Sequence, residues 1–288
     1  MISALPATRP LPLTPARRAI LAVGVPAAAA LIGWAGFTIV AAVGTGSYPV
    51  HDTIPLPDDH LTMSLDGGNL TLQGGAATGV ARLTGTVYYS LVRPDVHLDG
   101  DQSAGASHIG FGCAVSIGNC GLNATVDVPA STAVTISTGG GNLSATNLTS
   151  NISLSTGGGN LTATAITGDA SLHTGGGDLD AAQLTGDVDF STGGGNITAT
   201  IIDARQATAN SGGGDIEIVF TRVPQNVQVG TDGGDVTIVV PPGTASYDVT
   251  TSLGGGNLTD SVPQNSLSPN KITASSGGGD ITIEQSSR

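Results

Sequence analysis

The sequence has few charged and few aromatic residues. Of its 288 residues, 11% are charged and 3% are aromatic, whereas charged residues make up about 25% of an average globular domain. The surface must therefore be polar through serine, threonine, asparagine and glycine. The hydrophobic fraction of 39% consists almost entirely of alanine, valine, isoleucine and leucine. This composition predicts a thin, regular core without large aromatic rings.

Motifs of common catalytic sites are also missing. The five histidines are dispersed, and no G-x-S-x-G nucleophile motif occurs. The glycine triplets have no lysine or arginine beside them, which excludes a phosphate-binding loop. We therefore expect no enzyme activity, no catalytic residues and no cofactor. The enzyme that remains as an alternative is a β-helix enzyme acting on envelope polysaccharide, which would need converging carboxyl groups such as Asp178, Asp180 and Asp189.

Cys113 and Cys120 are the only cysteines in the sequence. A zinc site needs about four protein ligands, and no second cysteine pair is present. In an exported domain a cysteine pair indicates a disulfide, and six residues separate these two. We predict a Cys113–Cys120 disulfide, whose short loop contributes about 2–3 kcal/mol to stability.

Basic residues are rare after the first 18 positions. Six basic and 22 acidic residues follow Arg18, so this part of the chain has a net charge of −16. Such an acidic body disfavours nucleic acid and anionic lipid headgroups as partners. It suits a soluble domain with cations or basic molecules as partners.

The N-terminal part is predicted to cross a membrane once. Residues 1–18 are proline-rich and basic, and we expect a disordered cytoplasmic tail. Residues 19–43 carry no charge, and about 20 apolar residues span the hydrocarbon core as a helix. Arg17 and Arg18 precede this segment, so the positive-inside rule places the N-terminus in the cytoplasm and the C-terminal domain outside the cell membrane. The alternative is a cleaved signal peptide, whose apolar region would be shorter, about 7 to 15 residues.

Three regions follow the apolar segment. Residues 44–60 contain three prolines and little apolar patterning, and we expect a linker. Residues 61–134 are predicted to form an irregular first part of a β-repeat domain, which includes the two cysteines. Residues 135–288 are predicted to form its regular part.

The regular part contains units of 18 residues. The units that start at Thr135, Ser153 and Ser171 read TISTGGGNLSATNLTSNI, SLSTGGGNLTATAITGDA and SLHTGGGDLDAAQLTGDV. Apolar and polar residues alternate on both sides of the glycines, which is typical of half-buried strands. A βαβ unit needs about 30 residues, so this unit holds only two short strands and two corners. Because glycine enters positive φ freely, the triplet is expected to form one corner.

These units predict an all-β fold, a parallel β-solenoid or β-helix with two short strands per coil of about 18 residues, preceded by one N-terminal transmembrane helix. Coils stacked at about 4.8 Å would align one large apolar residue per coil in an inner column. A β-sandwich of antiparallel hairpins is the alternative, but it gives no reason for a constant period. The predicted column contains Leu143, Leu161, Leu179, Ile197, Ile216, Val236, Leu258 and Ile281.

A polar residue follows the glycines in every unit. An asparagine or aspartate ladder, in which each side chain bonds the next coil, explains the presence of both residue types. The alternative is Ca²⁺ bound at the corners by the stacked carboxylates Asp178, Asp215, Asp235 and Asp280. We expect no metal site, and the Ca²⁺ candidates that form a local acidic group are Asp178, Asp180, Asp187 and Asp189. The ladder positions are Asn142, Asn160, Asp178, Asn196, Asp215, Asp235, Asn257 and Asp280.

The segment VDVPASTAVTISTGGGNL, which begins at Val126, resembles the bacterial β-strand-repeat proteins of the "putative adhesin" family, whose function is unknown. The same pattern returns from Ile238 as IVVPPGTASYDVTTSLGGGNL. The resemblance extends from about Leu61 to the C-terminus. It implies a membrane-attached, extracytoplasmic β-solenoid, and it brings no catalytic residues.

Together these features predict a membrane-anchored extracytoplasmic β-repeat protein, a structural or adhesin-like surface binding module without chemistry of its own. Its expected partners are the membrane, through the N-terminal helix, and cell-envelope or surface proteins or glycans, but not nucleic acid. A Ca²⁺-stabilised repeat protein is the first alternative, and the polysaccharide enzyme is the second. Within the domain, binding is expected where the repeat is broken, at residues 100–121, in the longer C-terminal corners and at the acidic residues 178–189.

Overall fold

The computed structural model describes residues 45–76, 79–90, 96–97, 107–112 and 120–287. These residues form strands and turns, and among them no helix is long and apolar enough to span a membrane. The predicted cytoplasmic tail and transmembrane segment, residues 1–43, lie outside the described residues.

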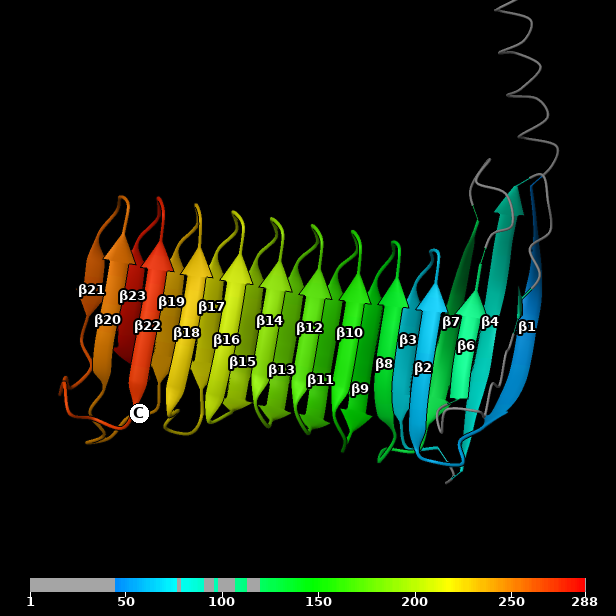
Figure 1. The fold of residues 1–288 in the computed structure, drawn as a ribbon, viewed down its shortest axis with the longest axis horizontal. Coiled ribbons are helices and arrows are strands. Elements are labelled where there is room, and N and C mark those ends of the chain that lie inside the picture. The colour runs from blue at the N-terminus through cyan, green and yellow to red at the C-terminus, as the bar shows by residue number, and fades with distance from the viewer. Residues whose placement is uncertain (1–44, 77–78, 91–95, 98–106, 113–119, 288) are drawn as a thin grey trace, which may run out of the picture. The chain divides into compact units, whose positions relative to one another are not determined.

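The strands form two sheets whose neighbours run mostly parallel, and the core lies between the sheets (Figure 1). In spatial order the first sheet contains β1 (Thr45–Pro55), β4 (Val80–Ser90), β7 (Gly121–Val128), β3 (Leu70–Gly74), β9 (Leu143–Leu148), β11 (Leu161–Thr167), β13 (Leu179–Thr185), β15 (Ile197–Asp203), β17 (Ile216–Phe220), β19 (Val236–Val240), β23 (Ile281–Gln285) and β21 (Leu258–Asp260). The second sheet contains β5 (Val96–His97), β6 (Ser107–Phe111), β2 (His60–Leu65), β8 (Ala133–Thr138), β10 (Ile152–Thr156), β12 (Ala170–Thr174), β14 (Val188–Thr192), β16 (Gln206–Ser211), β18 (Asn226–Thr231), β22 (Lys271–Ser276) and β20 (Asp248–Leu253).

Successive coils of the regular part stack in one register. Leu161 pairs with Leu143 on one side and with Leu179 on the other. In the second sheet, Ile152 pairs with Ala170. The predicted inner column is buried in every coil except the one at the end of the stack that contains β21. There Leu258 is 46% exposed. The parallel all-β stack expected from the repeat is therefore confirmed for the described residues.

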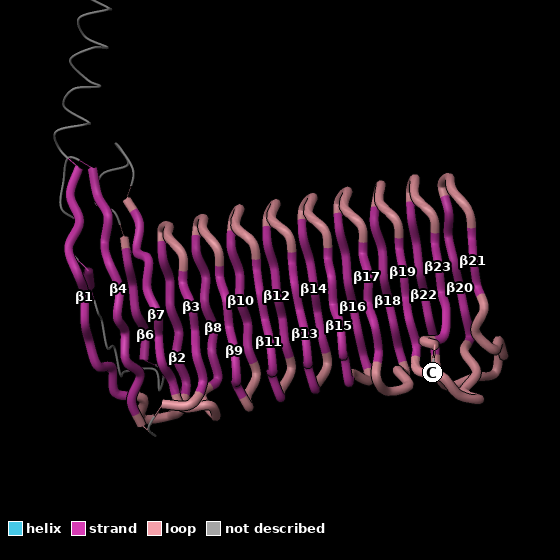
Figure 2. Tube along the Cα trace, turned by 180° about the vertical axis from the view of Figure 1, so that it is seen from behind, coloured by secondary structure: helices cyan, strands magenta, loops and turns pink. Residues whose placement is uncertain are grey.

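The coils do not follow the order of the sequence at either end of the stack. The coil β2–β3 lies between the coils β6–β7 and β8–β9. At the other end the C-terminal coil, β22–β23, inserts between β18–β19 and β20–β21 (Figure 2). As a result Val236 pairs with Ile281 and not with Leu258, because the long corners at residues 241–247 and 261–270 let the chain pass one position and return.

A left-handed residue interrupts the alternation in four strands of the first sheet. Its φ is between 56° and 59° at Asn147, Ala165, Gln183 and Ile201. The bend directs the following residue back into the core, so that Ile166 pairs with Leu184 and both are buried. This bend was not predicted, because the alternation of apolar and polar residues does not by itself show whether a strand is bent or straight.

The predicted linker is partly wrong, since residues 45–55 form β1. This strand lies beside β4 at the end of the first sheet, and β4 runs antiparallel to β7, with Arg82 opposite Asp127. Ile54 and Leu56 are buried against the core. Neighbouring strands supply the hydrogen bonds and the apolar surface that this proline-containing segment lacks by itself.

Candidate functional site

The asparagine and aspartate residues after the glycine corner form a continuous ladder. In every member except Asn257, which ends the ladder, the side-chain oxygen Oδ1 accepts a hydrogen bond from the backbone N–H of its counterpart in the adjacent coil. The N···O distance is 3.0 Å from Asp178 to Asn160 and 2.8 Å from Asn196 to Asp178. The predicted ladder is therefore present. In spatial order it contains Asn123, Asn69, Asn142, Asn160, Asp178, Asn196, Asp215, Asp235, Asp280 and Asn257.

The predicted ladder did not include Asn123, although its side chain accepts the N–H of Asn69 at 2.9 Å. Asn123 does not follow a glycine triplet, which was the feature used to define the column. The sequence Asn-Ala-Thr at this position matches the Asn-Leu-Thr of later units and is the signal that was available.

A buried threonine or serine precedes the glycines and fastens the same corner. Thr156 Oγ1 donates to the carbonyl of Gly141 in the neighbouring coil at 2.9 Å and accepts the N–H of Gly159 at 3.2 Å. These polar groups bond the protein itself and so are not free to hold a ligand. Equivalent pairs of bonds are made by Thr174, Thr192, Ser211, Thr231 and Ser276.

The glycines of the corner are required mainly because the backbones of adjacent coils approach closely. A Cβ on Gly159 would lie 1.9 Å from the carbonyl oxygen of Gly141, whereas a Cβ on Gly158 would meet nothing within 4 Å. The expected positive φ occurs at only some of these glycines, among them Gly141 at 107° and Gly256 at 76°. In most coils, therefore, close stacking explains the glycines better than the left-handed conformation does.

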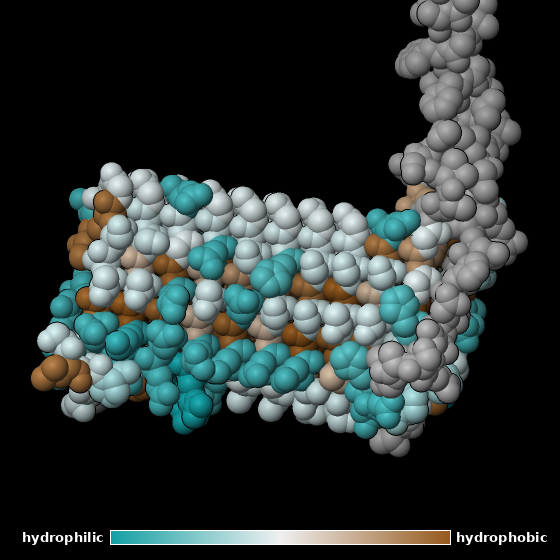
Figure 3. Space-filling model, viewed as in Figure 1, coloured by the Kyte–Doolittle hydropathy of each residue, from teal (hydrophilic) through white to brown (hydrophobic). Residues whose placement is uncertain are grey.

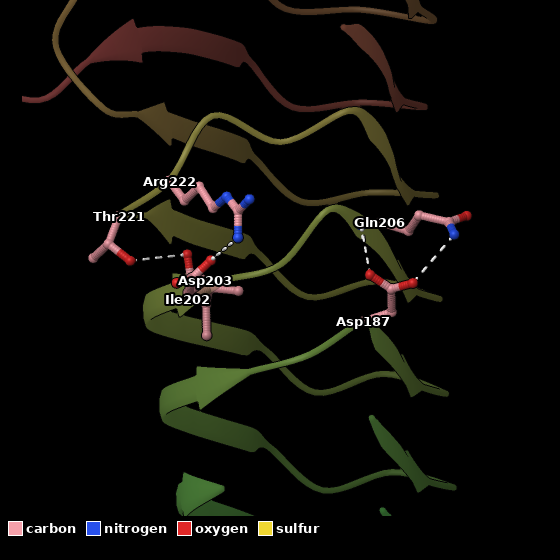
Figure 4. A network of polar contacts seen from close by, with 6 residues as sticks. All are labelled: Asp187, Ile202, Asp203, Gln206, Thr221 and Arg222. Carbon is pink, nitrogen blue, oxygen red and sulfur yellow. Dashed lines mark hydrogen bonds and ion pairs between the residues drawn. The ribbon is translucent and has the colours of Figure 1, made fainter. Parts of the chain in front are cut away.

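A shorter ladder lies at the opposite corner. Asn151 accepts the N–H of Asp169 at 2.8 Å, and Asp169 accepts the N–H of Asp187 at 3.0 Å. Figure 4 shows how Gln206 ends this series, with its backbone N–H and its side-chain amide both on the Asp187 carboxylate, at 3.0 and 3.1 Å. At this corner too, the carboxylates bond the stack.

An exposed ion pair lies across the same corner, on the side of the first sheet, where β15 ends at Asp203. Arg222 Nη1 is 3.5 Å from Asp203 Oδ1, and both side chains are substantially exposed to solvent (Figure 4). Exposed ion pairs contribute about 0–1 kcal/mol to the free energy of unfolding, so this contact adds little to stability.

The four Ca²⁺ candidates do not come together. Asp178 and Asp180 lie at the start of β13, while Asp187 and Asp189 lie beyond its end. Since a strand rises about 3.3 Å per residue, the two pairs are about 20 Å apart. Among the described residues no group of three or more histidine, cysteine, aspartate or glutamate side chains is placed to hold a metal ion.

A groove of about 500 Å³ runs along the outside of the second sheet, over the first residues of β2, β8, β10, β12 and β14. Asp169 and Asp187 line one side, and Ser171 and Asp189 lie across from them. His173 is nearby, 3.1 Å from Ser171 Oγ and 3.9 Å from Asp189 Oδ2. In Figure 3, which shows the face of the second sheet, apolar strips appear between rows of polar residues. The groove includes part of the predicted acidic face.

Cys120 is disulfide-bonded. The other cysteine of the predicted pair, Cys113, lies outside the described residues, so the Cys113–Cys120 pairing stays a prediction. Most of the insertion at residues 100–121 also lies outside them, apart from residues 107–112 and 120–121.

Two of the solved structures that are similar to the chain carry names that refer to adhesion. One is a "putative adhesin" of Bacteroides fragilis NCTC 9343, 17% identical, which covers 83% of this chain and 97% of its own with a TM-score of 0.49. The other is described as a "putative cell adhesion protein" of Clostridium sporogenes ATCC 15579, 14% identical, with coverage of 83% and 100% and a TM-score of 0.29. No curated protein matches the chain significantly.

The family comparison covers nearly the whole of the stack. The Toastrack DUF4097 family matches residues 53–287, which include every strand from β2 to β23. The matched region contains both ladders, the glycine corners and the groove. On this match the chain belongs to the Toastrack DUF4097 family.

Proposed function

We propose that this protein is a membrane-anchored extracytoplasmic module that acts as a structural or adhesin-like binding surface and has no chemistry of its own. The observation that carries the proposal is which groups the repeated polar side chains bond. Most of those that could have formed a site bond the backbone of the adjacent coil instead. What remains is a regular stack with outer faces of small polar residues, which suits an extended contact with another molecule.

The proposed location is supported by the sequence. Residues 19–43 carry no charge, and the chain after Arg18 is strongly acidic. Lys271 is the single lysine, and it is exposed at the start of β22. An amine reagent that does not cross the cytoplasmic membrane should therefore label Lys271 on intact cells and should label the N-terminal amine only after lysis.

The Lys271→Arg variant is the control for this labelling, since it keeps the charge and removes the reactive amine. Labelling of the N-terminus on intact cells, with Lys271 reached only after lysis, would reverse the proposed topology.

The groove on the second sheet is the proposed contact surface for an envelope protein or glycan. Ser171 lines it, whereas Thr162 has a similar half-buried position on the outside of the first sheet. We expect the full-length protein to bind at least one component of an array of envelope glycans and proteins. Ser171→Trp should weaken that binding at least tenfold, and Thr162→Trp should leave it unchanged.

Equal effects of the two tryptophan variants would contradict the groove as the contact surface, and absence of any binding would contradict the adhesin-like role. The same array tests for enzyme activity. The glycans should remain intact. If the protein degrades a glycan, and if the Asp178→Ala and Asp180→Ala variants do not, the protein is the polysaccharide enzyme instead.

A further inference from the structure

The first two strands at the N-terminal end of the first sheet are longer than the repeat strands. β1 and β4 have 11 residues each, compared with five to seven in β9 to β19. Figure 1 shows both strands extending past the turns of the neighbouring coils. At one end of this pair Leu56 donates its N–H to the Gly79 carbonyl at 2.9 Å, and at the other a Cβ placed on Gly46 would lie 2.5 Å from the Tyr89 ring. The start of β1 and the end of β4 therefore lie together, and we call residues 45–50 and 87–90 the arm tip.

Three of the four tyrosines of the protein lie in the arm tip. The rings of Tyr48 and Tyr89 are 6.1 Å apart between centroids and inclined by 57°. Tyr88 is 47% exposed, one of the few large hydrophobic side chains on the described surface. Because successive residues of a strand point to opposite faces, Tyr88 and Tyr89 place an aromatic ring on each side of β4. Tyrosine, with an apolar ring and a polar hydroxyl, is enriched where membrane meets water.

The charge of the arm tip differs from that of the rest of the domain. Residues 45–50 and 83–90 contain no charged side chain, whereas the chain after Arg18 has a net charge of −16. Moving a charged group toward the hydrocarbon layer is costly, and a neutral segment avoids this cost. The arm tip is thus a part of the domain that tolerates the lipid interface.

Only a few residues of the sequence separate the arm tip from the predicted membrane segment. Tyr48 follows residue 43 by five positions, and five residues span at most about 18 Å. We propose that the arm tip lies in the headgroup layer of the membrane that residues 19–43 are predicted to cross, with Tyr48, Tyr88 and Tyr89 as interfacial anchors. This inference rests on the proposed membrane anchor.

The test uses the full-length protein in phosphatidylcholine vesicles and the single tryptophan, Trp34, which lies within the apolar segment. Spin labels on the headgroup or deep in the acyl chain quench indole fluorescence only at their own depth. Trp34 in the unaltered protein should be quenched by the deep label. In the Trp34→Phe background, Tyr88→Trp should be quenched at least threefold more by the headgroup label than by the deep label.

Leu267→Trp in the same background is the matched control, because Leu267 is 89% exposed in the corner between β21 and β22 at the other end of the stack. Neither label should quench it. If Trp34 is quenched but Tyr88→Trp behaves like Leu267→Trp, the proposal that the arm tip lies in the headgroup layer is wrong, whereas the proposed membrane anchor is supported. If Trp34 itself is not quenched, the membrane anchor fails, and the arm proposal fails with it. Unchanged melting curves for both tryptophan variants establish that these readings come from folded protein.

Discussion

At the scale of single residues, two of the three glycines in a typical corner have no room for a side chain. Gly159→Ala would place a methyl group 1.9 Å from the Gly141 oxygen, and the backbone would have to move. We expect a loss of about 2 kcal/mol or more in the free energy of unfolding, as for other overpacked sites. Gly158→Ala, which meets nothing within 4 Å, should be neutral or stabilise by about 0.5 kcal/mol. Chemical denaturation measures both, and equal losses would contradict the close-approach explanation.

Ile201 is a β-branched residue in the left-handed conformation, with a φ of 58°, and it is 50% exposed. This conformation costs about 1–2 kcal/mol for such a side chain, and asparagine tolerates it better. Asn147 already occupies the equivalent place three coils away. Ile201→Asn should therefore raise the free energy of unfolding by about 1 kcal/mol. Ile201→Val keeps the β-branch and should give no gain, so a similar effect of both substitutions would argue against strain at this position.

At the scale of the elements, three carboxylates occupy successive positions of the ladder, Asp215, Asp235 and Asp280. Neighbouring coils are about 4.8 Å apart, so these like charges repel one another. Asp235→Asn keeps the Oδ1 acceptor for the Asp280 N–H and removes the central charge. We expect a higher melting temperature, with a larger increase at low salt than at high salt, because salt screens exposed charges.

Asp178→Asn is the control for the charge effect, because Asp178 lies between Asn160 and Asn196 in the ladder. Its effect on the melting temperature should be smaller and nearly independent of salt. Equal effects of the two substitutions would indicate that the amide group, and not relief of repulsion, causes the change.

A buried tyrosine lies in the corner before β20. Tyr247 is fully buried, and its hydroxyl has no hydrogen-bond partner among the described residues. Burial raises the pKa of the Tyr247 phenol above 10.0, so the unfolded state loses this proton at lower pH than the folded state does. The stability that depends on this group is complete below pH 10 and falls as the pH rises toward the raised pKa.

Tyr247→Phe should stabilise the protein by about 1 kcal/mol, because it removes an unpaired buried hydroxyl. The variant should also lose less stability than the unaltered protein above about pH 10. Denaturation at neutral and alkaline pH measures both effects. A destabilised variant would show that the hydroxyl has a partner in solution.

At the scale of the whole molecule, the stack is held by apolar columns and backbone hydrogen bonds. No metal cluster occurs among the described residues, and we expect the melting temperature to be the same with millimolar EDTA and with millimolar Ca²⁺. A ligand that binds only the folded state raises the melting temperature. An increase of several degrees with Ca²⁺, abolished by Asp187→Asn and Asp189→Asn, would favour the Ca²⁺-stabilised alternative.

Much of the fold could be predicted because each unit repeats the same local pattern. The buried column through Leu161 and Leu179 follows directly from alternation and from the constant period. The ladder was predictable because asparagine and aspartate share the oxygen that accepts the next N–H. The groove was predictable only in part, since Asp187 and Asp189 were recognised as acidic, but their positions beside Asp169 and Ser171 of the adjacent coil depend on how the coils stack.

The sequence by itself determined the parallel coil, its period and its inner column, because these depend on contacts between neighbouring units with the same pattern. The tertiary structure decided the order of the coils at both ends, the left-handed bend at Ile201 and the strand at residues 45–55. It also decided why the corners need glycine, which in most coils is the approach of another backbone. Such features depend on partners far away in the chain, and local sequence patterns carry no information about those partners.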